Sequence, residues 1–196
     1  MSARDDVLAS VRRALAGAAT GTVAVPSGYR SRRGPADVAG LFAERVADYR
    51  AIVERCAPGE VADRIMAALG QAERVLVPAG LPWPVPGQVD AGFSAAELDG
   101  YDAVVTGSTL GIAETGTIVL THGPGEGRRA LTLVPDLHVC VVRVGDLVAD
   151  VPAAIRQLDP GRPQTWISGP SATSDIELSR VEGVHGPRSL HVILVD

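Results

Sequence analysis

Apolar residues recur at helical spacing in three segments of the first third of the chain. Residues 4–16 carry a narrow apolar stripe behind an acidic first turn, which predicts a short amphipathic helix. The repeat over residues 38–56, which begins just after Pro35, predicts one long helix that ends before Pro58. The apolar pattern over residues 61–69 predicts a third helix.

Short apolar runs bounded by turn-forming residues dominate the rest of the chain and predict strands. They lie at residues 74–77, 102–105, 117–120, 131–134, 139–142 and 190–195, with a further strand ending at 166–167. A capping box at residues 94–97 predicts a single helical turn. A helix is also expected over residues 145–158, where Pro152 could introduce a kink.

Strands that alternate with helices predict an α/β fold. The short turn between Leu120 and Leu131 predicts that part of the sheet is antiparallel, so we expect a mixed open sheet flanked by helices. Residues 20–34 are turn-rich and aperiodic. We therefore expect residues 1–34 to form an N-terminal helix and linker, and residues 35–196 to form the α/β domain.

Length and charge narrow the class of protein. A chain of 196 residues can bury a sizeable core in one domain. Its formal net charge is −5 and its charged residues are scattered, which argues against a nucleic-acid-binding surface with clustered cations. The N-terminus carries acids where a signal peptide needs a basic end, and no segment has the ~20 apolar residues of a membrane span. These features predict a cytoplasmic protein.

The sequence lacks the usual binding motifs for two common kinds of redox cofactor. Cys56 and Cys140 are far apart and each lies in an apolar segment, so neither has the spacing that holds zinc or an iron–sulfur cluster. The sequence also has no credible Gly-x-Gly-x-x-Gly unit for binding a dinucleotide. We expect both cysteines to be buried thiols.

Two polar segments rich in small residues, 106–116 and 168–174, are expected to follow strand ends and to meet at one cleft. Open α/β sheets bind ligands outside the carboxyl ends of their strands. The second segment runs into a capping box at residues 174–177, and its amides could form an anion site together with His185 and Arg188. The alternative is an ordinary capped connection whose polar groups bond to one another.

Four blocks of sequence, in this order, resemble the lactate-utilization protein C (LutC/YkgG) family, whose domain is called LUD. They are GSTLGIAETGTIVL (107–120), LVPDLH (133–138), SGPSATSDIE (168–177) and GVHGPR (183–188), within a resemblance that covers residues 38–196. The resemblance implies a fold similar to the NagB/RpiA/CoA-transferase group. It also implies a part in oxidising L-lactate to pyruvate alongside two partner proteins, one of which carries iron–sulfur clusters.

The residues limit what this chain could do in such a system. Lactate oxidation passes two electrons to an acceptor, and the sequence offers no cluster ligands, so we expect redox cofactors in the partners and none bound by this chain. The chain could then supply a substrate or anion site, an acid/base group or a docking surface. Two alternatives are a stand-alone transferase or ligase acting on a CoA ester or nucleotide, and a purely structural assembly module.

Glu114 is the leading candidate for an acid/base or nucleophilic carboxylate, because it lies among small residues at the mouth of a strand. The alternative is a carboxylate that caps neighbouring amides. His185 is expected to be exposed, titratable and, beside Glu114, catalytic. Arg188 suits a carboxylate ligand, whereas His122 and His191 look structural. No metal site is expected, since no pair of ligand residues has helical spacing. The other expected ligand-binding residues are Thr109, Thr115, Gly116, Thr117, His138, Ser171, Thr173, Ser174 and Asp175.

Overall fold

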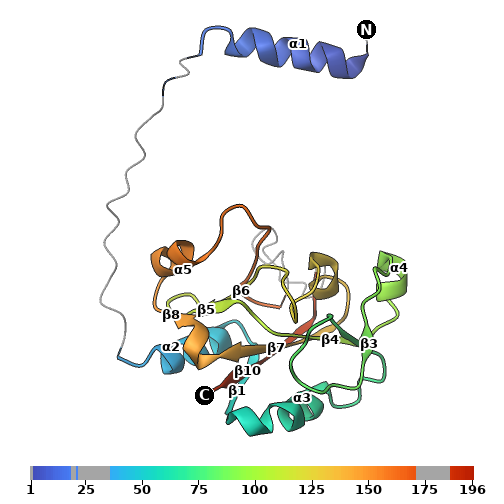
Figure 1. Cartoon of the computed structure of the whole chain (residues 1–196), viewed down its shortest axis with the longest axis vertical. Helices are drawn as coiled ribbons and strands as arrows, with labels where there is room; N and C mark the ends of the chain where they lie inside the picture. The colour runs from blue at the N-terminus through green and yellow to red at the C-terminus, as the bar shows by residue number, and fades with distance from the viewer. Residues whose placement is uncertain (1, 19–20, 22–35, 171–185) are drawn as a thin grey trace. The chain divides into compact units, whose positions relative to one another are not determined.

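The computed structural model describes residues 2–18, 21, 36–170 and 186–196. The chain divides into two compact units, Met1–Arg30 and Ser31–Asp196, which we describe separately. All the strands of the described part belong to the larger unit (Figure 1).

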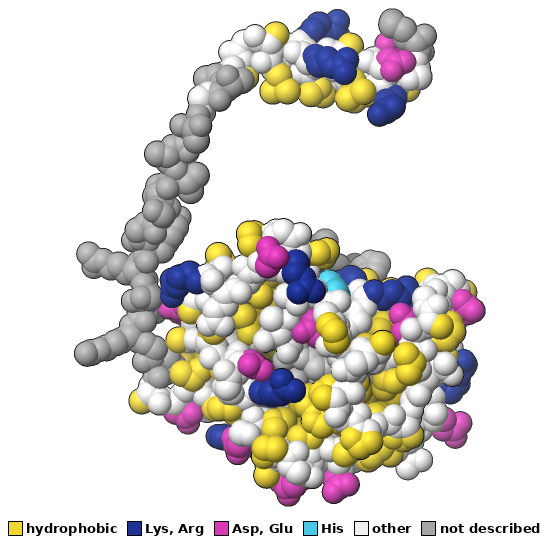
Figure 2. Space-filling model, in the orientation of Figure 1, with side chains coloured by type: hydrophobic (Ala, Val, Ile, Leu, Met, Phe, Trp, Pro, Cys, Tyr) yellow, Lys and Arg dark blue, Asp and Glu magenta, His cyan; other side chains and the backbone are white. Residues whose placement is uncertain are grey.

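The smaller unit contains α1 (Ala3–Leu15), which confirms the short helix predicted there. Ser2 and Asp5 form a capping box: the Ser2 hydroxyl accepts from the Asp5 N–H at 3.3 Å, and the Asp5 carboxylate accepts from the Ser2 N–H at 3.0 Å. Apolar side chains gather along one side of α1 (Figure 2). None of the residues of α1 is buried by the described part of the chain.

Six parallel strands form the main sheet of the larger unit (Figure 1). In spatial order they are β1 (Ile52–Cys56), β10 (Ser189–Val195), β7 (Leu137–Arg143), β4 (Ala103–Thr106), β2 (Val75–Val77) and β3 (Gln88–Val89). The longest pairing joins β7 and β10, from Leu137 against Ser189 to Arg143 against Val195. Elements cover both faces of this sheet, which explains why its central strands are nearly continuous apolar runs.

One face of the main sheet is covered by α3 (Val61–Leu69), which follows a 3₁₀ turn, η1 (Pro58–Glu60). The helix buries Val61, Ile65 and Leu69, whose spacing places them on one side of a helix. They pack against side chains that alternate along the strands: Val75, Val77, Ala103, Val105, Val139, Val141, Ile193 and Val195.

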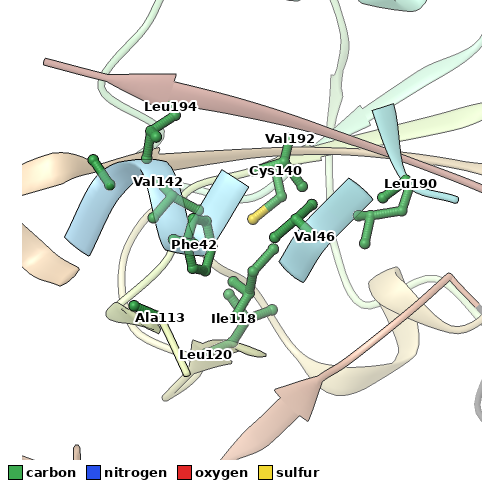
Figure 3. Packing of buried hydrophobic residues seen from close by; sticks show 12 residues of the cluster. Phe42, Val46, Ala113, Ile118, Leu120, Cys140, Val142, Leu190, Val192 and Leu194 are labelled. Carbon is green, nitrogen blue, oxygen red and sulfur yellow. The ribbon is translucent and has the colours of Figure 1, made fainter. Parts of the chain in front are cut away.

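The opposite face packs against α2 (Val38–Asp48) and a second sheet. The second sheet has the order β8 (Leu147–Val148), β5 (Leu110–Ile112), β6 (Thr117–Leu120) and β9 (Thr165–Ile167). In Figure 3 the side chains of Phe42 and Val46 fill the space between the main sheet, at Cys140, and the second sheet, at Ile118. This cluster holds the two sheets together.

Smaller elements close the remaining surfaces of the two sheets. Leu98 of α4 (Ala95–Leu98) and Leu131 of η2 (Arg129–Thr132) are buried against the main sheet. Ala154 of α5 (Val151–Gln157) packs on the outer face of the second sheet. A 3₁₀ turn, η3 (Val144–Asp146), joins β7 to β8.

The predicted α/β class, with a mixed sheet flanked by helices, is confirmed, although the strands are divided between a parallel sheet and a mixed one. The apolar runs at residues 74–77, 102–105, 117–120, 139–142 and 190–195 are strands, and residues 61–69 are helical. The likeness to the NagB/RpiA/CoA-transferase group stays a prediction. Within the described ranges, no helix is long and apolar enough to cross a membrane.

The single long helix predicted over residues 38–56 is wrong in its second half. The helix ends at Asp48, the backbone turns at Arg50 with a φ of 66°, and residues 52–56 form β1. Ile52 and Val53 are β-branched and suit a strand. Parallel pairing of β1 with β10 then satisfies the backbone, so a contact with the far end of the chain overrides the helical spacing.

Two other local predictions are wrong. Residues 131–134 do not form a strand, because the chain makes the η2 turn and uses Leu131 as a single buried anchor. The helix predicted from residue 145 begins only at Val151, after β8 has paired with β5. The Asp150 carboxylate caps it by accepting from the Ala153 N–H at 2.8 Å, and Pro152 lies in the first turn, where it introduces no kink.

The antiparallel part of the fold is present but involves other strands than predicted. Residues 120 and 131 do not flank a strand pair. Instead β6 pairs antiparallel with β5 on one side and with β9 on the other. The first strand and the turn of the β5–β6 hairpin lie inside the segment 106–116, which was expected to be a loop.

Candidate functional site

The polar segment 106–116 is divided by a strand. It begins where β4 ends, at Thr106, passes through β5 at residues 110–112, and turns at residues 113–116 into β6. A strand advances by about 3.3 Å per residue. Thr109 and Thr115, on either side of β5, therefore belong to two separate polar regions.

The first region is a chain of three hydroxyls, from Thr115, Thr117 and Ser168, which we call the hydroxyl cluster. The Thr115 and Thr117 oxygens are 2.6 Å apart, and the Thr117 and Ser168 oxygens are 2.8 Å apart. Ser168 follows β9, so the pairing of β9 with β6 brings the two predicted polar segments into contact. Each hydroxyl can donate or accept, so the direction of these two hydrogen bonds can reverse.

The hairpin turn beside the hydroxyl cluster is held against α2. The phenol of Tyr49 donates to the carbonyl of Gly116 at 2.7 Å, and burial raises the pKa of this phenol, so it remains a donor. Gly116 has a φ of 64°, and a Cβ there would lie 2.8 Å from the Arg45 backbone. Only glycine fits this contact. Glu114 is exposed, and its N–H donates to the Ala149 carbonyl at 3.1 Å.

The second region surrounds a buried carboxylate that the sequence reasoning missed. Glu126 accepts from the Thr109 hydroxyl at 2.6 Å and from the Thr121 N–H at 2.6 Å, and it is only 7% exposed. The Thr109 and Thr121 hydroxyls also lie 2.8 Å apart. Charge-assisted hydrogen bonds to a carboxylate are among the stronger ones in proteins. Glu126 thereby fixes the shape of the glycine-rich loop that contains it.

That loop borders a groove of about 580 Å³ beyond the carboxyl ends of β2 and β6, which we call the carboxyl-edge groove. The loops on its two sides touch through glycine: a Cβ on Gly80 would lie 2.9 Å from the Pro124 side chain. The groove is lined by Pro78, Ala79, Gly80, Asp90, His122, Gly123, Pro124, Gly127, Arg128, Leu131 and Arg162. The GPGEG motif at residues 123–127 is the sequence signal that could have indicated it.

Charged side chains in this groove differ in how they are paired. Arg128 donates to both carboxylate oxygens of Asp90, at 2.7 and 3.0 Å, and these bonds hold the pKa of Asp90 below its ordinary value. The Arg162 guanidinium reaches towards Gly123, and no described residue forms an ion pair or hydrogen bond with its side chain. Arg162 therefore gives the groove a positive charge that no described carboxylate pairs with.

His122 is held in a fixed orientation at the same groove. It has a φ of 60°, which is uncommon for a residue other than glycine. Its Nδ1 lies 2.8 Å from the Gly127 carbonyl, so this nitrogen must carry a proton. Its Nε2 lies 3.0 Å from the Thr165 hydroxyl, so both ring nitrogens have a hydrogen-bonding partner.

His138, a predicted ligand residue, is buried inside the main sheet and is 1% exposed. Its Nε2 lies 2.8 Å from the Thr106 hydroxyl, which also approaches Cys140 at 3.6 Å. Burial, with the positive charge of Arg129 as a second cause, lowers the pKa of His138 to about 4. The ring is therefore neutral at pH 7.

Arg188 lies just before β10 and forms an ion pair with Asp136, which lies just before β7, at 3.5 Å. This pair is at the amino edge of the main sheet, opposite to the edge where Thr106 ends β4. Both partners are more than half exposed, so the pair adds little stability. Five other predicted site residues lie outside the described residues: Ser171, Thr173, Ser174, Asp175 and His185.

The two cysteines are buried thiols, as predicted. Burial raises the pKa of Cys140 to about 12, and burial is also the main cause of a raised pKa for Cys56. Among the described residues, no group of three or more His, Cys, Asp or Glu side chains is arranged to hold a metal ion.

Comparisons with known proteins agree on one family. Residues 90–195 match the model of the LUD domain, a range that takes in every strand except β1, β2 and β3. A lactate utilization protein C from Deinococcus radiodurans is 44% identical over 98% of this chain and 95% of its own length. One from Shouchella clausii is 38% identical over 55% of this chain and 49% of its own length.

A solved structure gives the same result for the fold. The crystal structure of a DUF162 family protein from Deinococcus radiodurans matches with a TM-score of 0.66 at 42% sequence identity. The match covers 81% of this chain and 96% of that one. The arrangement of strands and helices described above is thus shared with a protein of known structure.

Proposed function

The chain belongs to the LUD domain family, and we propose that it takes part in lactate utilization. The observation that carries the proposal is the 44% identity to the lactate utilization protein C of Deinococcus radiodurans. That similarity extends over 98% of this chain, so it is not confined to one motif. We further propose that residues 35–196 form the LUD domain proper, with a fold of the NagB/RpiA/CoA-transferase kind, behind an extension of residues 1–34.

In this proposal the chain is a subunit of an iron–sulfur-dependent system that oxidises L-lactate to pyruvate. The oxidation removes two electrons and two protons from the substrate. Iron–sulfur clusters are held by several thiolates, whereas this chain has two cysteines, both buried. We therefore assign the electrons to clusters in a partner protein, and the binding of the substrate to this chain.

We propose that the substrate carboxylate binds at the hydroxyl cluster. Thr115, Thr117 and Ser168 are linked at 2.6 and 2.8 Å and can turn their hydroxyl protons towards an anion. Glu114 lies next to them in the chain and is the proposed acid/base group for the substrate hydroxyl. His185 and Arg188, from the segment that leads into β10, are proposed to complete the site.

Growth on lactate tests the role of the protein. We expect that deleting its gene abolishes growth on L-lactate as sole carbon source and leaves growth on glucose intact, because only lactate oxidation would lose a subunit. Unimpaired growth on L-lactate, in a strain without a second copy of the gene, would contradict the proposal.

Complementation of the deletion tests the site. The variants Glu114→Gln and Thr117→Val should restore growth on L-lactate poorly, because one removes an ionisable group and the other removes a hydroxyl from the cluster. Glu73 is exposed and lies just before β2 of the main sheet, so Glu73→Gln is the matched control and should restore growth fully. Equal growth of all three strains would show that lactate utilization does not depend on Glu114 or on the hydroxyl cluster.

A further inference from the structure

The carboxyl-edge groove plays no part in the proposed lactate site, yet it has the size of a ligand site. Its volume of about 580 Å³ lies within the roughly 300–1,000 Å³ of pockets that bind drug-sized molecules. A three-carbon acid would fill only a small part of it. The groove also lies outside the carboxyl ends of parallel strands, the usual ligand position in open α/β folds.

The charges of the groove favour an anion with several acceptor oxygens. Arg128 uses Nε and Nη2 to bind Asp90 and the Phe93 carbonyl, which leaves Nη1 without a hydrogen bond to any described residue. Arg162 has no side-chain partner among the described residues. A phosphate presents more acceptor oxygens than a carboxylate and can accept from two guanidinium groups at once.

The rest of the lining suits an apolar or aromatic portion of the same ligand. Pro78 and Pro124 come from the two loops that meet at Gly80, and both line the groove. The ring nitrogens of His122 are already occupied by Gly127 and Thr165. This residue can therefore offer a ligand its ring surface, and aromatic rings stack favourably on nucleobases.

We propose that the carboxyl-edge groove binds an organic phosphate of nucleotide size. The phosphate lies between Arg162 and Arg128, and the base or other apolar portion lies against Pro78, Pro124 and His122. This site is separate from the hydroxyl cluster, which lies beyond the other end of β5 and β6. The ligand is thus a second molecule, a co-substrate or an effector, and not lactate itself.

Isothermal titration calorimetry of the full chain with AMP, coenzyme A, inorganic phosphate and L-lactate tests this proposal. We expect AMP or coenzyme A to bind, with an affinity that falls as the salt concentration rises. Arg162→Gln should weaken this binding about tenfold or more, because a charge-assisted hydrogen bond is lost. Arg156→Gln is the matched control: Arg156 is exposed on α5, outside the groove, and its loss should leave the affinity unchanged.

Four results would overturn the proposal. These are no binding of either organic phosphate, equal loss of affinity in both variants, inorganic phosphate binding as tightly as AMP, or competition between L-lactate and AMP. Circular dichroism and the thermal midpoint serve to check that Arg162→Gln is folded. We expect it to be folded, because no described residue forms a hydrogen bond or ion pair with this side chain. The lactate growth assay is independent of these outcomes, so the two proposals can fail separately.

Discussion

His138 and His122 look alike in the sequence but occupy opposite environments. The sequence predicts a ligand role for His138 and a structural role for His122. In the structure His138 is enclosed by the main sheet and bonds to Thr106, whereas His122 is held by Gly127 and Thr165 at the edge of the carboxyl-edge groove. The difference comes from strand pairing, which no property of either residue reveals.

The burial of His138 makes stability depend on pH. Its pKa is about 4 in the folded chain and 6.5 ordinarily, so the unfolded chain binds an extra proton between these pH values. We expect the free energy of unfolding to fall as the pH falls through this window, by up to about 1.4 kcal/mol per pH unit from this residue. Urea unfolding at pH 7.5, 6 and 5 measures the fall. The free energy of unfolding of His138→Gln should fall less steeply with falling pH. An unchanged pH dependence in that variant would contradict the assignment of the effect to His138.

At the scale of elements, the sequence predicts well those strands that are buried on both faces. Nearly continuous apolar runs form β4, β6, β7 and β10. A short apolar run between turn residues is usually a buried strand, because it is too short for a typical helix. The edge strand β1 is different, because Glu54 and Arg55 interrupt it and its apolar residues also fit a helical repeat. Its identity depends on pairing with β10, which is not local information.

The candidate site, too, could be predicted from the sequence only where local pattern decides the structure. The hydroxyl cluster could be anticipated in part, because Thr115, Thr117 and Ser168 lie in polar segments that end or begin at strands. Their contact depends on the antiparallel pairing of β6 with β9, which the sequence pattern assigned to other residues. The carboxyl-edge groove was missed because its charged residues, such as Asp90 and Arg128, are far apart in the sequence.

The N-terminus of α2 offers a test at this scale. The Asp37 carboxylate accepts from the Gly40 N–H at 2.7 Å and caps the helix that supports the hairpin turn. We expect Asp37→Ala to lower the free energy of unfolding by about 1 kcal/mol, the usual effect of losing such a cap. Asp48→Ala, at the other end of α2, is the control and should be neutral or slightly stabilising, because it removes a negative charge from the negative end of the helix dipole. Chemical denaturation measures both, and similar losses in the two variants would argue against a capping role for Asp37.

At the scale of the whole molecule, the second sheet connects the two polar regions. Thr117, at one end of β6, belongs to the hydroxyl cluster, and Thr121, just past the other end, bonds to Glu126 beside the carboxyl-edge groove. Four residues of strand span about 13 Å. One short, fully buried strand thus fixes the spacing between the two proposed binding sites.

The larger unit should fold without the N-terminal extension. All four hydrophobic clusters of the described chain consist of residues from Val38 onwards. We expect the free energy of unfolding of a chain of residues 35–196 to lie within about 0.5 kcal/mol of that of the full chain, since the deletion removes no residue of these clusters. Chemical denaturation followed by tryptophan fluorescence measures this, because Trp83 and Trp166 both lie in the retained part. A large loss of stability would move the domain boundary towards the N-terminus.

The position of β10 has a consequence for how the protein is made. This strand lies between β1 and β7, and its His191 contacts Glu54 across 137 residues of sequence. During translation, β1 emerges from the ribosome before β10 and has no neighbour in the main sheet until β10 follows. Pairings over such distances are slow to form, and exposed strand edges invite aggregation. The nascent chain therefore has to keep β1 from aggregating until β10 is made, because the main sheet closes on this side only when β10 is inserted between β1 and β7, both of which precede it in the chain.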